Sequence, residues 1–194
     1  VESYDVAVSG GLLSAILWNN RGKALANLEE WDKAIASYDE ALALDPEYLR
    51  ALENRGSTHY EMENYEAAAG DLRQVINLDE EEDGSIRLML AETYVQLSED
   101  RKAIIYYSES MRKGKESAEI YFKRGSCYSR IEDMENALSD LNQAYNAGKK
   151  DAELFLERAN VNIRLDNSRA AMNDLNEAIS REDTHADAYF NRGY

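Results

Sequence analysis

The chain has 194 residues, of which 44% are hydrophobic, and its 38 acidic and 22 basic side chains give a formal net charge of −16. This acidic balance argues against nucleic-acid binding, which normally requires a basic surface. No apolar run approaches the roughly 20 residues needed to span a bilayer, so we expect no membrane span.

Small residues recur along the chain in two columns, with steps of 34 or 35 residues. The first column contains Gly22, Gly56, Ala91, Gly125, Ala159 and Gly193. The second contains Ala34, Ala68, Ala103, Ala137 and Ala171. Two columns that share the same steps indicate a repeat protein, in which each repeat packs on its neighbours and the core is a continuous strip.

In chain order, the columns predict a single array over residues 1–194. It consists of half a repeat at 1–14, full repeats at 15–48, 49–82, 84–117, 118–151 and 152–185, and half a repeat at 186–194. Residues 1–9 match the second helix of the following repeat, and residues 186–194 match the start of the preceding one. We therefore expect a fragment of a longer array, or an array whose uncapped ends pair with another copy.

Each full repeat is predicted to form two helices of roughly 14 residues joined by a tight turn, because apolar residues recur three and four positions apart. In the first full repeat these helices cover about residues 14–28 and 30–44, and Pro46 closes the pair. Gly114 and Gly148, each followed by lysine, are predicted to end later second helices. The extra residue falls in Asp79–Gly84, an acidic run that predicts a solvated loop or, alternatively, an acidic contact for a basic partner.

These landmarks resemble the tetratricopeptide repeat. In the first full repeat the resemblance is carried by Trp18, Gly22, Leu25, Trp31, Ala34, Tyr38, Ala41 and Pro46. The third repeat departs most, with Arg87 where an aromatic residue is usual. The resemblance implies an all-α, right-handed superhelical solenoid of helix pairs. It also implies that the first helices line a concave groove for an extended peptide or a helix of a partner.

Catalytic chemistry finds little support in the sequence. His59 shares a packing column with Leu25, Tyr94 and Tyr128, so we expect a structural histidine, and Cys127 lies in a column of small residues. No His/Cys cluster has metal-ligand spacing, and no glycine-rich phosphate loop appears. We expect no enzyme, no metal and no cofactor. The single cysteine excludes an internal disulfide, and we expect a cytoplasmic location.

Arginines recur just before the first small column, and aspartates recur on the following helices. The matched pairs are Arg55/Asp71, Arg124/Asp140 and Arg158/Asp174. The third repeat carries Leu90 and Tyr106 at the same two positions. Because arginine and aspartate vary together, we predict an ion pair within each of these repeats that ties its two helices together. The alternative is that the arginines face a ligand.

Helix geometry predicts which side chains of the first helices face the groove. Amides and a cation lie near the start: Asn19, Asn20, Lys23 and Asn54. An apolar ladder follows, formed by Leu88, Phe122, Leu156 and Phe190 with Met89 and Ile163 beside it. The same face carries the polar residues Lys123, Asn160 and Asn191. The alternative for the ladder is that it packs between neighbouring repeats.

The leading interpretation is a non-enzymatic scaffold that binds a peptide or helical segment of a partner protein in its concave groove. Amides can hydrogen-bond a peptide backbone, and an exposed apolar ladder marks an interaction site. Two alternatives stay open. The chain could self-assemble into homo-oligomers through its uncapped ends, or it could recruit substrates to a catalytic domain outside these residues.

Overall fold

The computed structural model describes residues 1, 4, 6 and 14–181, and within them the chain is all-α with no strand. The chain divides into two compact units, Val1–Glu99 and Asp100–Tyr194. The first unit contains α2 (Ala15–Ala26), α3 (Trp31–Leu44), α4 (Leu49–Glu61), α5 (Tyr65–Leu78) and α6 (Ser85–Gln96). The second contains α7 (Asp100–Arg112), α8 (Ala118–Arg130), α9 (Met134–Asn146), α10 (Ala152–Arg164) and α11 (Ser168–Arg181).

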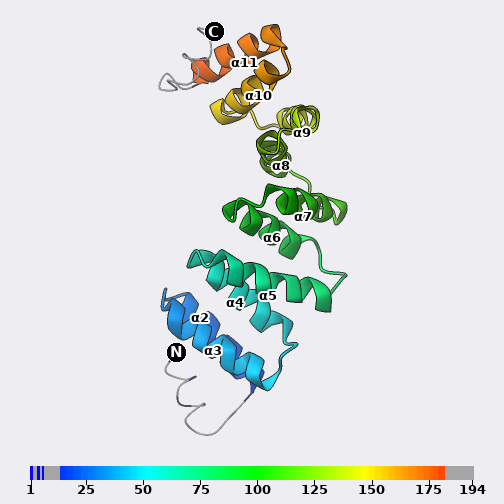
Figure 1. Ribbon diagram of the computed structural model, residues 1–194. Helices are drawn as coiled ribbons and strands as arrows, with labels where there is room; N and C mark the ends of the chain where they lie inside the picture. The colour runs from blue at the N-terminus through cyan, green and yellow to red at the C-terminus, as the bar shows by residue number, and fades with distance from the viewer. Residues whose placement is uncertain (2–3, 5, 7–13, 182–194) are drawn as a thin grey trace. The chain divides into compact units, whose positions relative to one another are not determined.

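Each predicted full repeat contains two of these helices, and Figure 1 shows the pairs α2–α3 and α4–α5 of the first unit, and α8–α9 and α10–α11 of the second, as antiparallel hairpins. The third repeat, 84–117, contributes α6 to the first unit and α7 to the second. The predicted half repeat 186–194 and most of 1–14 lie outside the described residues. No helix in the described part of the chain is long and apolar enough to cross a membrane.

The turn between the two helices of every repeat contains a non-glycine residue with positive φ. These residues are Glu29, Glu63, Ser98, Glu132 and Asp166, with φ between 56° and 67°. Such left-handed residues end a helix by turning the next N–H groups back towards its last carbonyls. Accordingly, the N–H of Glu30 donates to the carbonyl of Leu25, and the N–H of Asn167 to that of Asn162. The second helices α7 and α9 end differently, at Gly114 (φ 91°) and Gly148 (φ 107°), as predicted.

Within each unit, the core follows the two helices of a pair and continues into the next helix along the chain. Both columns of small residues are buried wherever the structure describes them, and large side chains such as Tyr38 and Leu141 are fully enclosed against them. One hydrophobic cluster joins Ala41 on α3, Leu52 on α4 and Val75 on α5. The core is therefore a strip that spans successive repeats within a unit, as repeat architecture requires.

The expectation that Asp79–Gly84 is a wholly solvated loop is wrong for Glu82, which is 9% exposed. One carboxylate oxygen of Glu82 accepts the N–H groups of Gly84 (2.8 Å) and Ile86 (3.1 Å) at the start of α6. The other accepts a hydrogen bond from the guanidinium of Arg87, which is also buried. Glu82 thus caps α6 and neutralises the arginine that replaces the family's usual aromatic residue.

Candidate partner-binding surface

The first helices of the unit Val1–Glu99 place amide side chains side by side. Asn54 on α4 donates to the Oδ1 of Asn19 on α2 over 2.8 Å, and Asn19 contacts Asn20 through a longer 3.5 Å bond. Asn19 is only 3% exposed, so little of its side chain is accessible, and its amide joins two repeats. Asn20 and Lys23 are exposed, and Asn54 is half-buried.

The apolar part of the predicted surface is also more enclosed than expected. Phe122 on α8 is 7% exposed and packs in a hydrophobic cluster with Leu141 and Leu154. The ammonium of Lys149 lies over its ring, 4.4 Å from the centroid. Phe122 is therefore a core residue, and the described part of the ladder is not a continuous exposed strip.

Lys149 covers Phe122 because acidic side chains hold it there. Its Nζ lies 2.8 Å from a carboxylate oxygen of Asp151 and 3.0 Å from one of Glu119. Burial lowers the pKa of Lys149, but the hydrogen bonds to Asp151 and Glu119 outweigh burial, and the pKa lies above its usual value. The lysine thus stays charged over the ring, a favourable cation–π arrangement.

The remaining predicted surface residues differ in exposure. Leu88 and Met89 on α6 are half-buried, and the Ser57 hydroxyl on α4 lies 3.5 Å from the Met89 sulfur. In the second unit, Lys123, Leu156 and Asn160 are half-buried, whereas Ile163 is 42% exposed. Phe190 and Asn191 lie outside the described residues.

The predicted ion pairs within repeats are confirmed. The guanidinium of Arg124 donates through Nε and Nη2 to the two oxygens of Asp140, over 2.6 and 2.8 Å. Arg55 pairs with Asp71, and Arg158 with Asp174, through the same two nitrogens. Each aspartate is at most 6% exposed. Two parallel charge-assisted hydrogen bonds fix the separation of the two helices of a repeat.

The same arginines make a contact with the preceding repeat that the sequence interpretation missed. Nη1 of Arg55 donates to Asp39 (2.6 Å), Nη1 of Arg124 to Ser108 (2.9 Å), and Nη1 of Arg158 to Asn142 (3.1 Å). These acceptors lie 16 positions before the arginine, just as the paired aspartates lie 16 positions after it. The signal was present in the sequence as a column of hydrogen-bond acceptors. It did not stand out, because the residue type changes from repeat to repeat.

The described residues bring together few groups suited to catalysis. They contain no cluster of three or more His, Cys, Asp or Glu residues that could hold a metal ion. Cys127 is fully buried, and burial raises the pKa of its thiol to about 12, so it is protonated at neutral pH.

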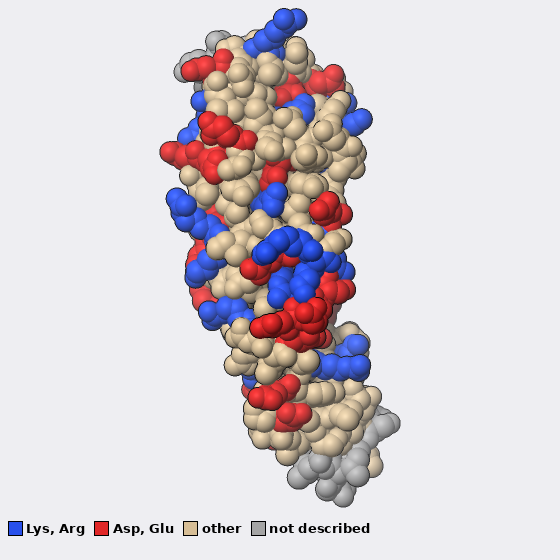
Figure 2. Space-filling model, turned by 90° about the vertical axis from the view of Figure 1, so that its right-hand side faces the viewer, with Lys and Arg blue, Asp and Glu red and all other residues tan. Residues whose placement is uncertain are grey.

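Charged side chains of both signs are interspersed over the face in Figure 2, and no large patch of one sign is visible there.

Comparison with protein-family models finds the tetratricopeptide repeat at residues 15–48, 53–114 and 118–147. Together with the repeated helix pairs, these matches show that the chain belongs to the tetratricopeptide repeat family. Proteins of this family are in general non-catalytic interaction modules.

Curated relatives match over part of the chain. Mouse sperm-associated antigen 1 is 32% identical over 112 residues, 58% of this chain and 12% of that protein. The DnaJ homolog subfamily C member 7 homolog of Schizosaccharomyces pombe is 30% identical over 57% of this chain and 22% of that protein. The peroxisomal targeting signal receptor of Kluyveromyces lactis is 34% identical over 42% of this chain and 14% of that protein. The chain thus spans less than a quarter of the length of these relatives.

Solved structures share the fold. YrrB, described as a tetratricopeptide repeat protein with an unusual peptide-binding site, aligns with a TM-score of 0.87 at 22% identity, covering 98% of both chains. MamA aligns with a TM-score of 0.79 at 17% identity, covering 89% of this chain and 94% of that one. At these identities the likeness establishes the helical-repeat fold.

Proposed function

We propose that the chain is a non-enzymatic scaffold that binds a peptide or helical segment of a partner protein along its first helices. Membership of the tetratricopeptide repeat family supports the general role of a protein-interaction scaffold. Two similar proteins support the peptide ligand, because one is named a peroxisomal targeting signal receptor and the other is described as having a peptide-binding site.

The observation that carries the proposal is the line of accessible side chains along α2, α4 and α6. Asn20 and Lys23 are exposed, and Asn54 and Met89 are partly exposed. The Asn19–Asn54 bond fixes the amide plane of Asn54 and uses only one of its N–H groups, so the other hydrogen-bonding groups of that amide suit a peptide backbone.

Because Phe122 is enclosed, it restricts the kind of partner segment that we expect to bind. The accessible apolar surface on the described first helices is supplied by single side chains such as Met89 and Ile163, not by an aromatic ladder. A suitable segment therefore carries isolated apolar anchors and relies mainly on hydrogen bonds from its backbone. Extended peptides offer such groups along their whole length.

The proposal can be tested with matched double variants. The first-helix variant combines Lys23→Glu on α2 with Met89→Glu on α6. The control combines Lys33→Glu on α3 with Ile76→Glu on α5, because Lys33 is exposed like Lys23 and Ile76 is half-buried like Met89. Peptides selected from a displayed random library against the parent chain serve as ligands.

We expect the first-helix variant to bind the selected peptides at least about tenfold more weakly, a loss of about 1.4 kcal/mol, and the control to bind like the parent. Equal binding by both variants, or a loss confined to the control, would place the peptide elsewhere and contradict the proposal. Light scattering over a concentration series gives the oligomeric state. If the selected peptides only displace a second copy of the chain, the result would support the alternative that the chain forms homo-oligomers.

A further inference from the structure

A hollow of about 480 Å³ lies between the second helices α9 and α11, with α10 beneath it. It belongs entirely to the unit Asp100–Tyr194 and is separate from the first-helix surface described above. Its volume lies in the range of about 300–1,000 Å³ that is typical of small-ligand sites. Four asparagines line it together with the Arg158–Asp174 pair, and we call it the amide hollow: Asn142, Asn162, Asn167 and Asn173.

One lining residue of the amide hollow is smaller than the aromatic residues at the same position of other repeats. Asn162 occupies the column that holds Tyr128 in the preceding repeat and His59 in the first unit. The ring of Tyr128 lies beside its own arginine, with the Arg124 guanidinium carbon 5.9 Å from the ring centroid. Asn162 is much smaller than either ring and leaves space above Arg158.

Charge within the amide hollow is balanced. Arg158 uses Nε and Nη2 on Asp174 and Nη1 on Asn142, so its donors are directed at acceptors of the chain itself. Asn162 and Asp174 are only 4% and 5% exposed. The charges of Arg158 and Asp174 offset each other, so the lining offers no uncompensated charge that would favour a charged ligand over a neutral one.

The asparagines retain hydrogen-bonding capacity. Asn162 donates to Asp174 (3.3 Å) and accepts from Asn167 (3.4 Å), which orients both amides. Asn142 accepts from Arg158 through Oδ1, so its NH₂ group faces away from that bond. Among the described residues, Asn173 has no side-chain hydrogen bond. Donors and acceptors are therefore both available, which matches the paired C=O and N–H of another amide.

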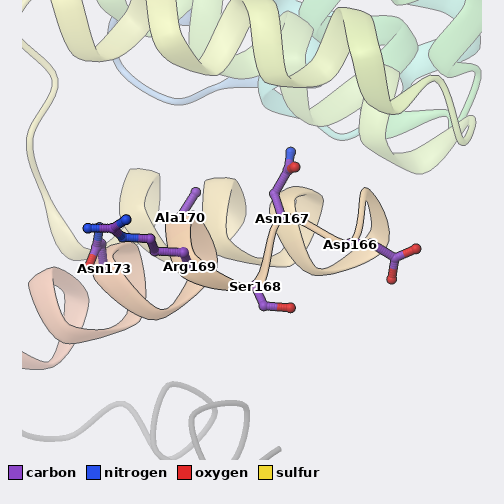
Figure 3. Close-up of a pocket in the computed structure, with 6 residues that line it drawn as sticks. All are labelled: Asp166, Asn167, Ser168, Arg169, Ala170 and Asn173. Carbon is purple, nitrogen blue, oxygen red and sulfur yellow. The ribbon is translucent and has the colours of Figure 1, made fainter.

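The hollow continues along the start of α11. A second depression shares Asn167, Ala170 and Asn173 and extends to Ser168 and Arg169. In Figure 3, Asn167 and Ala170 point to the same side of this segment, and Arg169 lies beside Asn173. The two depressions adjoin at these shared residues, so a ligand that occupies both would extend along the start of α11.

We infer that the amide hollow is a second docking site, which takes a short extended peptide segment of uncharged polar residues such as Gln, Asn and Ser. The aromatic rings beside it, Tyr145 and Phe155, are covered by the Arg158 guanidinium, at 4.8 and 5.6 Å. The ligand is therefore bound through amide hydrogen bonds and not by stacking on a bare ring.

The test uses the full chain and a short fluorescein-labelled peptide of alternating Gln and Ser residues, followed by fluorescence anisotropy. Peptides with Glu or Lys in place of Gln measure the preference for a neutral ligand. Asn162→Tyr fills the hollow with the residue found at position 128. Asn173→Leu removes one amide, and Asn176→Leu, an exposed residue of the same helix outside the hollow, is its matched control.

We expect saturable binding of the Gln/Ser peptide, weaker binding of both charged peptides, and at least about tenfold weaker binding by Asn162→Tyr and Asn173→Leu. Asn176→Leu and the single substitution Lys23→Glu should bind like the parent, which separates this site from the proposed function. No binding by the parent, equal binding by Asn173→Leu and Asn176→Leu, or preference for a charged peptide would overturn the inference. If Asn162→Tyr fails to fold, the comparison of Asn173→Leu with Asn176→Leu tests the inference.

Discussion

Single residues set how closely the helices of a repeat approach. Gly22 on α2 lies against the ring of Tyr38 on α3, and a Cβ atom added there would come within 2.5 Å of Cε1 and 2.7 Å of Cδ1. Tyr38 is 1% exposed and cannot move aside without displacing its neighbours. Gly70 on α5 differs, because an added Cβ would meet nothing within 4 Å.

Alanine at these two positions should therefore act in opposite directions. Gly22→Ala should lower the free energy of unfolding by about 1–2 kcal/mol, because overpacking against Tyr38 exceeds the gain in helix propensity. Gly70→Ala should raise it by about 0.5–1 kcal/mol through propensity alone. Urea unfolding followed by circular dichroism measures both. Two shifts of the same sign would contradict the role given to Tyr38.

The second residue-scale prediction concerns His59 on α4. Its Nδ1 is buried with no hydrogen-bond partner among the described residues. Burial lowers the pKa of His59 from 6.5; Asp71 opposes this shift and Arg55 adds to it. The unfolded chain therefore binds the proton more readily than the folded one, and stability falls as the pH drops below the unfolded value of 6.5.

Replacing His59 by Leu, the residue at the equivalent position 25, should remove this part of the pH dependence. Between about pH 8 and about pH 5, the parent should lose more stability than His59→Leu, because only the parent has a histidine to protonate here. Thermal unfolding at several pH values gives the difference in stability between the two proteins. The contributions of carboxylates cancel in this difference, because both proteins contain the same carboxylates. Parallel curves for the two proteins would show that this imidazole is not linked to folding.

At the scale of helices, Arg55, Arg124 and Arg158 each tie a first helix to the second helix of its own repeat and to that of the preceding repeat. The third repeat, where Leu90 and Tyr106 stand at the paired positions, shows that the family fold tolerates an apolar alternative. Removing only the arginine of a pair should lower the stability of the fold strongly, because it leaves a buried carboxylate without a partner.

Arg124→Leu should therefore destabilise the chain by about 3–5 kcal/mol, because it leaves Asp140 buried and unpaired. The double variant Arg124→Leu with Asp140→Tyr reproduces the third repeat and should recover most of that loss. The double-mutant cycle is measured by urea unfolding. If the double variant is as unstable as the sum of the two single variants, the pair does not act as a unit.

At the scale of the whole molecule, the net charge of −16 opposes compactness through self-repulsion, while ion pairs between close neighbours are local. The buried Arg–Asp pairs are screened by salt much less than exposed charges. Added salt should therefore relieve repulsion more than it weakens these pairs.

We expect the melting temperature to rise as sodium chloride increases from about 0.01 M to about 0.15 M, over which the screening length falls from about 30 Å to about 8 Å. Calorimetry measures the shift. Replacing exposed acids of the second helices, such as Glu40 and Glu135, by glutamine should reduce the salt effect. A melting temperature that falls with salt would mean that local ion pairs dominate.

Much of the fold was predictable because it depends on spacing along the chain. The helix pairs, the buried small columns and the Arg–Asp pairs each follow from residues at fixed offsets. The left-handed turn residues were not predicted, because none of them is glycine or asparagine, the residue types that usually mark this conformation. Glu82 was also missed, because its burial depends on Arg87, an exception to the repeat pattern.

The sequence by itself determined the repeat period, the family and the ion pairs within repeats, because periodic spacing is sufficient to specify them. Only the tertiary structure decided which first-helix side chains a partner can reach. Exposure depends on side chains from neighbouring repeats and loops: Asn54 covers Asn19, and Lys149 covers Phe122. The amide hollow likewise required three helices to be placed together, since no motif marks the absence of a ring at Asn162.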